Sequence, residues 1–354
     1  MVKKVLIKAS LATLLSISFV GCVANTSIKV KDYKSYKLKS NVNKQEIAKK
    51  LKEANKPRRV ALITTNPAKQ SRLAKKAGLD SIVQSQIKKH LMETGNINFI
   101  TNIDSNPKLK EKIIDLEYDG INIEDDIFDY IILTKIENAG FTNKFQEAYR
   151  TECTKIINNQ KVKTTCVVPP RMTYTATVSG AIEVLHLIDN KLVNELELPF
   201  SDNASRTEDT RREKKLETDN TLMAKATKDA IRQSRIKIMN YFAPKGFIQR
   251  GKRKEKDYIF QTTLGLGKIK EGDKVVIYHE QKEINPLTGK LETTIKEVAN
   301  GVVSSESTNK YSWIIIDGDN GENVELGDFI QVKYESTLMD SVLKVGTFLN
   351  SLGK

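Results

Sequence analysis

The chain has 354 residues, with 58 lysines and arginines against 44 acidic residues, a net charge of +14 and 39% hydrophobic residues. This hydrophobic content allows a buried core and excludes global disorder, and the length suggests two domains. Three cysteines are too few for a disulfide-built miniature scaffold, and His90, His186 and His279 are too far apart in the sequence to indicate a histidine-based metal cluster.

Residues 1–21 have the pattern of a secretory signal peptide. Three lysines among the first eight residues precede an apolar run, Leu11 to Val20, which is shorter than the ~20 residues of a spanning helix. The segment Phe19–Cys22 resembles a bacterial lipobox, which implies that Cys22 carries a covalent lipid and becomes the new N-terminus. A plain signal peptide with an incidental cysteine is the alternative.

The residues after the lipobox indicate the membrane in which the lipid would lie. Val23 and Ala24 follow Cys22 where retention in the inner membrane would favour Asp, so the sequence predicts a lipid anchor in the outer membrane, facing the periplasm. A pI of 9.4 would suggest nucleic acid in a cytosolic protein, but an exported chain without an aromatic-interleaved basic stripe argues against that partner. We interpret most lysines as solvated surface, with acidic envelope polymers or anionic headgroups as alternatives.

Residues 22–57 are rich in Lys, Ser and Asn, and we interpret them as a lipidated tether. The α/β domain expected over 58–249 opens with a short buried strand at Val60–Ile63. The spacing of Leu79, Val83, Ile87 and Leu91 predicts a helix face. A strand at Ile97–Thr101, a short helix at Lys108–Leu116 and a strand at Tyr130–Leu133 that extends towards Ala139 are expected to follow.

The second half of this domain is predicted to contain two long strands, Thr173–Ile188 and Lys191–Leu198. Pro199 lacks an N–H donor and is expected to end the second strand. The polar segment Ser201–Asp219 is interpreted as a mobile loop or a solvated helix start, and Thr218–Phe242 is predicted to be a helix.

An insertion at 141–172 contains the other two cysteines, Cys153 and Cys166. Folding this stretch as a hairpin about Asn159-Gln160 would place the cysteines directly opposite each other, where their Cα atoms would lie about 4.5–5.5 Å apart. Because an exported protein meets an oxidising compartment, we expect a disulfide. Two free buried thiols are the alternative.

Residues 250–336 are expected to form a small SH3-like β-domain after a basic linker, Arg250–Lys256. Short strands, including Val275–Tyr278 and Ile330–Tyr334, alternate with turn signals, which is typical of a small barrel. Residues 337–354 are predicted to form a C-terminal helix.

Three short motifs give only weak signals for a ligand or catalytic site. Gly265–Gly267 lacks the helix start of a phosphate loop, and Glu124–Asp126 is more typical of a solvated loop than of an acid/base pair. Asp317–Gly321 resembles the opening of a calcium loop but has strand flanks. The sequence therefore predicts a non-enzymatic protein without a catalytic or metal site and with no cofactor other than the lipid on Cys22.

The strand at Arg59–Ile63, the helix, strand, helix order after it, and the strand at Asp129–Leu133 resemble the α/β domain of the curli secretion lipoprotein family (CsgG/TolB-N-like). That domain is similar to the middle domain of FlgT-like flagellar H-ring proteins, which is followed by an SH3-like domain; here Lys270–Tyr278, the Asn285–Gly289 turn and Leu326–Val332 resemble it. The resemblance covers about residues 58–336 and implies a homo-oligomer that assembles with other envelope or flagellar proteins.

We therefore expect a structural component of an envelope machine, with a flagellar-motor accessory ring as the first hypothesis. A curli-type secretion channel and a regulator of cell-wall synthesis enzymes are the alternatives. A spanning barrel strand needs about 9–11 residues that alternate apolar and polar side chains. The insertion 141–172, with lysines such as Lys155 and Lys161, has no such apolar band, which argues against a pore.

Overall fold

The computed structural model describes residues 26–40, 48–49, 56–64, 71–100, 128–157, 160–188, 191–284, 286, 289 and 291–336. These residues form two compact units. The described residues up to Lys56 join Ala243–Glu335 in what we name the barrel unit, and those within Pro57–Phe242 form the sheet unit.

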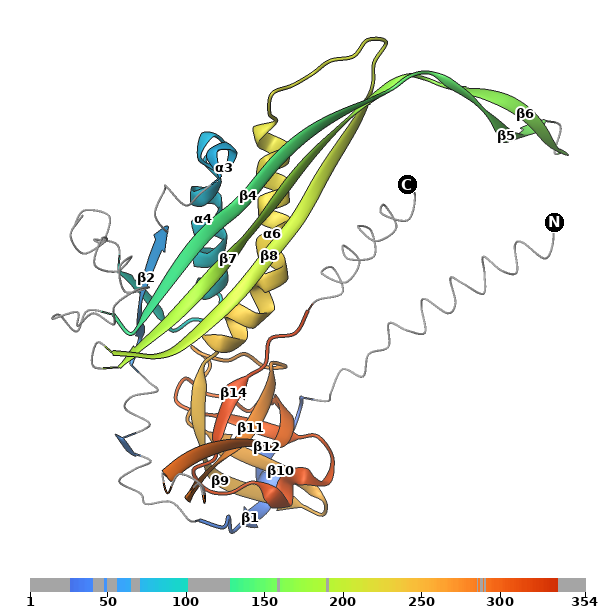
Figure 1. The fold of residues 1–354 in the computed structure, drawn as a ribbon. Coiled ribbons are helices and arrows are strands. Elements are labelled where there is room, and N and C mark those ends of the chain that lie inside the picture. Colours follow the sequence, from blue (N-terminus) through green and yellow to red (C-terminus); the bar gives the residue numbers. More distant parts are fainter. Residues whose placement is uncertain are drawn as a thin grey trace. The chain divides into compact units, whose positions relative to one another are not determined.

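The sheet unit is built on five strands in the order β3-β2-β4-β7-β8 (Figure 1). Strand β2 runs parallel to both β3 and β4, whereas β4, β7 and β8 are antiparallel to one another. The bounds are β2 (Arg58–Thr64), β3 (Ile97–Ile100), β4 (Tyr130–Gln146), β7 (Arg171–Ile188) and β8 (Lys191–Asp209).

Three helices cover one face of this sheet: α3 (Arg72–Lys76), α4 (Leu79–Met92) and α6 (Asn220–Tyr241) (Figure 1). Helix α6 begins after Asp219, whose carboxylate accepts a hydrogen bond from the Leu222 N–H at 3.0 Å, as an N-cap does. The core between helices and sheet includes Val60, Val83, Ile132, Tyr174 and Ile231, and a second cluster with Ala61, Ile131 and Leu185 lies on the other face.

Strands β4, β7 and β8 are 17, 18 and 19 residues long. The sheet therefore continues well past the part in which both of its faces are buried. Along this extension one face stays apolar and the other carries hydroxyl side chains, which pair across strands at Thr173–Thr207 (3.1 Å) and Thr175–Ser205 (3.2 Å). This alternation is the pattern of a sheet with one solvated face.

Two sequence predictions about β8 are wrong. Pro199 does not end the strand but pairs with Ala181, and Ser201–Asp209 continues the strand where a polar loop was expected. Among the described strands β8 lies at the edge of the sheet, where a missing N–H need not break the ladder. Polar residues fit this strand because one of its faces meets water.

Six antiparallel strands of the barrel unit form a barrel in the order β9-β10-β13-β12-β11-β14, which the pairing of β14 with β9 closes. Phe260, Ile277, Ile314 and Ile330 are buried in its interior. The bounds are β9 (Lys245–Lys254), β10 (Asp257–Thr262), β11 (Lys274–Ile284), β12 (Leu291–Val303), β13 (Ser312–Ile316) and β14 (Phe329–Val332), with a 3-10 turn η3 (Gly318–Asn323).

The predicted fold class, an α/β domain followed by a small SH3-like barrel and a C-terminal helix, is wrong. The described part of the chain is mostly β, with 51% strand against 21% helix, and the barrel unit is a closed barrel of six antiparallel strands. Strand outweighs helix in part because β4 and β8 extend beyond the ends expected for them, whereas β7 lies close to its predicted bounds. The predicted helix over 337–354 lies outside the described residues.

The segments interpreted as linker and tether also differ. Arg250–Lys256 is not a linker, because it contains the end of β9 and the turn to β10, where Lys254 pairs with Asp257. Within the proposed tether, η1 (Val30–Asp32) and β1 (Lys34–Tyr36) lie on the barrel, and Ser35 pairs with Lys252 of β9. Both segments therefore belong to the barrel unit.

Candidate functional site

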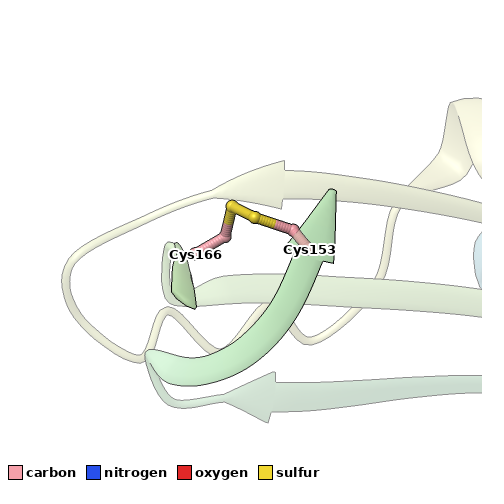
Figure 2. The surroundings of a disulfide bond; sticks show 2 residues. All are labelled: Cys153 and Cys166. Atoms are coloured by element: carbon pink, nitrogen blue, oxygen red, sulfur yellow. A yellow bond between two sulfur atoms is a disulfide. The ribbon is translucent and has the colours of Figure 1, made fainter. Parts of the chain in front are cut away.

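The disulfide lies on a separate two-stranded hairpin, β5 (Tyr149–Ile157) and β6 (Gln160–Val168), which we name the arm. It joins β4 to β7 at the far end of the long strands (Figure 1). Figure 2 shows Cys153 and Cys166 joined across it, with Cα atoms 5.8 Å apart. The sulfur pairing expected from the sequence is therefore present in the structure.

The register of the arm differs from the prediction by two residues. Ile157 pairs with Gln160, so Cys153 is opposite Thr164 and Cys166 is opposite Thr151. The disulfide is diagonal and does not join directly opposed residues. The midpoint argument failed because it placed the turn by symmetry between the cysteines, whereas backbone pairing sets it one residue earlier.

The arm has little core of its own. No residue of β6 is buried, and Ile156 and Val167 are 72% and 64% exposed on one face, while Tyr149 and Val162 are exposed on the other. An isolated two-stranded hairpin is marginally stable in water. The disulfide therefore holds in place a ribbon that carries apolar side chains into solvent.

Cys22, the predicted lipidation site, lies outside the described residues. Four residues further on, the chain is bound to the barrel. The Thr26 carbonyl accepts a hydrogen bond from the Ser305 N–H at 3.0 Å, and its hydroxyl donates to Glu271 at 2.6 Å. The contact continues to Lys39, whose carbonyl accepts from the Leu326 N–H at 2.9 Å.

The three histidines lie in different environments, as their spacing suggests. His90 is buried in α4, and burial lowers its pKa to about 4. His186 of β7 stacks on Tyr130, with ring centroids 4.5 Å apart. His279 of β11 pairs through Nδ1 with Oδ1 of Asp328 at 2.7 Å.

The His279–Asp328 pair was missed by sequence reasoning, because the two residues are 49 positions apart and no motif joins them. Asp328 is buried, and burial raises its pKa, while hydrogen bonds from the Glu325 N–H and from His279 oppose the rise. Through this contact the Asp328 carboxylate fixes the orientation of the His279 ring.

His279 lines a pocket of about 460 Å³ on the barrel unit. A β-bulge after Ile277 displaces the register beside it, and a buried Glu325 oxygen, Oε2, has no hydrogen-bond partner. The other lining residues are Gln281, Lys296, Glu297, Val298, Asn320 and Asn323. The amides of Gln281, Asn320 and Asn323, the Lys296 ammonium and the Glu297 carboxylate give the described lining both donors and acceptors for a polar ligand.

Two of the weak motifs of the sequence lie within the described residues. Gly265 packs against the backbone of Asn309, and Asp317 precedes the 3-10 turn η3. Glu124–Asp126 and the helix expected at Lys108–Leu116 lie outside the described residues. Within the described part of the chain, no three His, Cys, Asp or Glu side chains come together as metal ligands would. Among the described helices, none combines the length and apolar character needed to cross a bilayer.

No family model matches the chain, and no match to it is found among curated proteins. The resemblance to curli secretion lipoproteins and to FlgT-like proteins therefore stays a prediction from short sequence patterns.

Proposed function

We propose that this protein is a structural component of an envelope assembly, held on the periplasmic side of the outer membrane by a lipid on Cys22. A flagellar-motor accessory ring is the first assembly to test. The main support for the proposal is the arm, a disulfide-bonded hairpin that belongs to the core of neither unit and exposes apolar side chains on each face. Such a ribbon has little use inside a single folded chain, but it supplies a contact surface for a partner.

The arm also supports export. A disulfide persists in oxidising compartments and is rare in the cytosol. This agrees with the signal-like segment and the lipobox at Phe19–Cys22. The mechanism we propose is positional: the lipid holds the protein at the membrane, and the arm and the edge strand β8 provide surfaces for assembly.

The secretion channel is less well supported. A membrane-spanning strand would turn its apolar side chains to lipid. In the extended part of β4, Phe141 and Phe145 instead pack against the core of the sheet unit. The homo-oligomer that we propose therefore uses the arm for protein contacts.

Anchoring is tested by cell fractionation of a Cys22→Ala variant, which should move from the outer membrane to the soluble periplasmic fraction. The matched control is the double variant Cys153→Ser/Cys166→Ser, which removes the other two cysteines and should stay with the membrane. If the Cys22→Ala protein is recovered in the outer membrane as before, the anchoring proposal is wrong.

Assembly is tested by placing charge on the arm. Ile156→Asp with Val167→Asp changes one face of the hairpin, and the complex extracted in mild detergent should become smaller by light scattering. The control is Ile284→Asp with Ile295→Asp, two residues that are 69% and 58% exposed on one face of the β11–β12 hairpin. Unchanged size in the arm variant, or an equal loss in the control, would contradict a role for the arm.

A further inference from the structure

The chain between the predicted lipid and the barrel is very short. Thr26 is bound to Ser305 and Glu271 on the barrel, and only residues 23–25 separate it from Cys22. A fully extended chain spans at most about 3.6 Å per residue, so the four steps from Cys22 to Thr26 reach about 14 Å. A lipid on Cys22 would therefore keep this point of the barrel within about 14 Å of the backbone of the lipid-bearing residue.

The barrel has a defined end at this point, formed by the loops 263–273 and 304–311. The two loops are joined by a hydrogen bond from the Leu266 N–H to the Thr308 carbonyl at 2.9 Å, three residues after Ser305. Gly265 lies against the backbone of Asn309 beside this bond. Leu266 is thus near Thr26 and fixed relative to it.

Leu266 is the apolar side chain that this end presents to solvent, with 43% of its surface exposed. The two loops together carry three lysines and three acidic residues: Lys268, Lys270, Glu271, Asp273, Glu306 and Lys310. Because these charges balance, attraction of a basic patch to anionic lipid does not explain a contact here. The contact would rest on the anchor and on the exposed leucine.

We infer that the barrel end formed by 263–273 and 304–311 lies on the bilayer that holds the lipid of Cys22, with Leu266 at the membrane interface. The inference rests on the proposed lipidation and adds an orientation to it. The occupant of this surface is the bilayer itself, because the four-residue span limits how far this end of the barrel can lie from the lipid.

The other end of the barrel unit provides an internal control. Strand β11 starts at Lys274, next to the membrane-facing loops, and ends at Ile284. Ten steps of about 3.3 Å place Ile284 about 30 Å away along the strand. Ile284 is also apolar and is 69% exposed, so it differs from Leu266 chiefly in its distance from the anchor.

The test uses the full lipidated protein in phosphatidylcholine vesicles with or without brominated acyl chains, which quench tryptophan on contact. Leu266→Trp and Ile284→Trp are made as separate variants that keep the single native tryptophan, Trp313. The emission of the unaltered protein provides the baseline. Brominated lipid should remove at least half of the emission added by Leu266→Trp and leave that added by Ile284→Trp unchanged. Equal quenching of both, or quenching of neither, in protein that floats with the vesicles would overturn the inference.

Two measurements keep this outcome separate from the fate of the proposed function. Mass spectrometry of the N-terminal peptide reports whether Cys22 carries lipid, and flotation of a Cys22→Ala variant reports whether the anchor is needed. Lipid on Cys22 with no quenching at Leu266 refutes the orientation alone. Absence of the lipid refutes the anchoring and, with it, the orientation.

Discussion

His90 makes the stability of the sheet unit depend on pH. It lies buried in α4, 6% exposed, and its Nδ1 has no hydrogen-bond partner. Burial is the main cause that lowers its pKa, from 6.5 to about 4, and Arg235, Lys89 and Arg232 act in the same direction while Glu93 opposes them. The folded protein therefore holds this imidazole neutral at pH values where an unfolded chain would protonate it.

The direction and size of this pH dependence of the free energy of unfolding follow from proton linkage. Between pH 6.5 and pH 4 the unfolded chain binds a proton at His90 that the folded chain does not, so the free energy of unfolding falls as the pH falls. Each pKa unit corresponds to 1.36 kcal/mol, so the loss amounts to about 3 kcal/mol and is complete below about pH 4.

Replacing His90 by Leu isolates this contribution, because Leu is apolar and does not titrate. Urea unfolding of both proteins, followed by circular dichroism from pH 7 to pH 4, should show the variant gaining about 3 kcal/mol relative to the wild type as the pH falls. Carboxylates titrate in the same range in both proteins and cancel in the difference. A difference that stays constant with pH would refute the reasoning that His90 is held neutral by burial.

Two further predictions concern backbone packing and the disulfide. Gly180→Ala should lower the free energy of unfolding by about 3 kcal/mol, because the new Cβ would overlap the Lys135 carbonyl. The control is Gly267→Ala, whose Cβ meets no atom within 4 Å and which should change the free energy of unfolding little. Equal urea midpoints for the two variants would contradict this prediction. Cys153→Ser/Cys166→Ser should make the arm sensitive to limited proteolysis and leave the urea midpoint of the protein nearly unchanged, since no residue of β6 is buried. A large shift of that urea midpoint would show that the arm is part of the core.

Much of the sheet unit could be predicted from local patterns. The run Val60–Ile63 lies in β2, the apolar spacing of Leu79 to Leu91 coincides with α4, and the helix predicted at Thr218–Phe242 is α6. Each of these elements buries a face that repeats at short range, so a window of a few residues contains the signal. The extension of β8 beyond Pro199 could not be predicted, because a proline and polar residues fit a strand only when it is an edge with one solvated face.

The barrel unit was harder to predict because its strands carry fewer local signals. Arg250–Lys254 is basic, and its membership of β9 follows only from pairing with β10 and β1. The His279–Asp328 pair also depends on strand pairing. His279 meets Asp328 because β11 pairs with β14, which no sequence spacing indicates.

The sequence by itself determined the elements whose burial repeats locally, such as β2, α4 and α6, and it indicated that Cys153 and Cys166 lie on one hairpin. The tertiary structure alone decided that β14 closes on β9, that Thr26 is bound at one end of the barrel, and that the arm stands outside the cores. The reason is physical: an amphipathic period is set by neighbouring residues, whereas strand partners, edges and exposed faces depend on contacts between residues far apart in the chain.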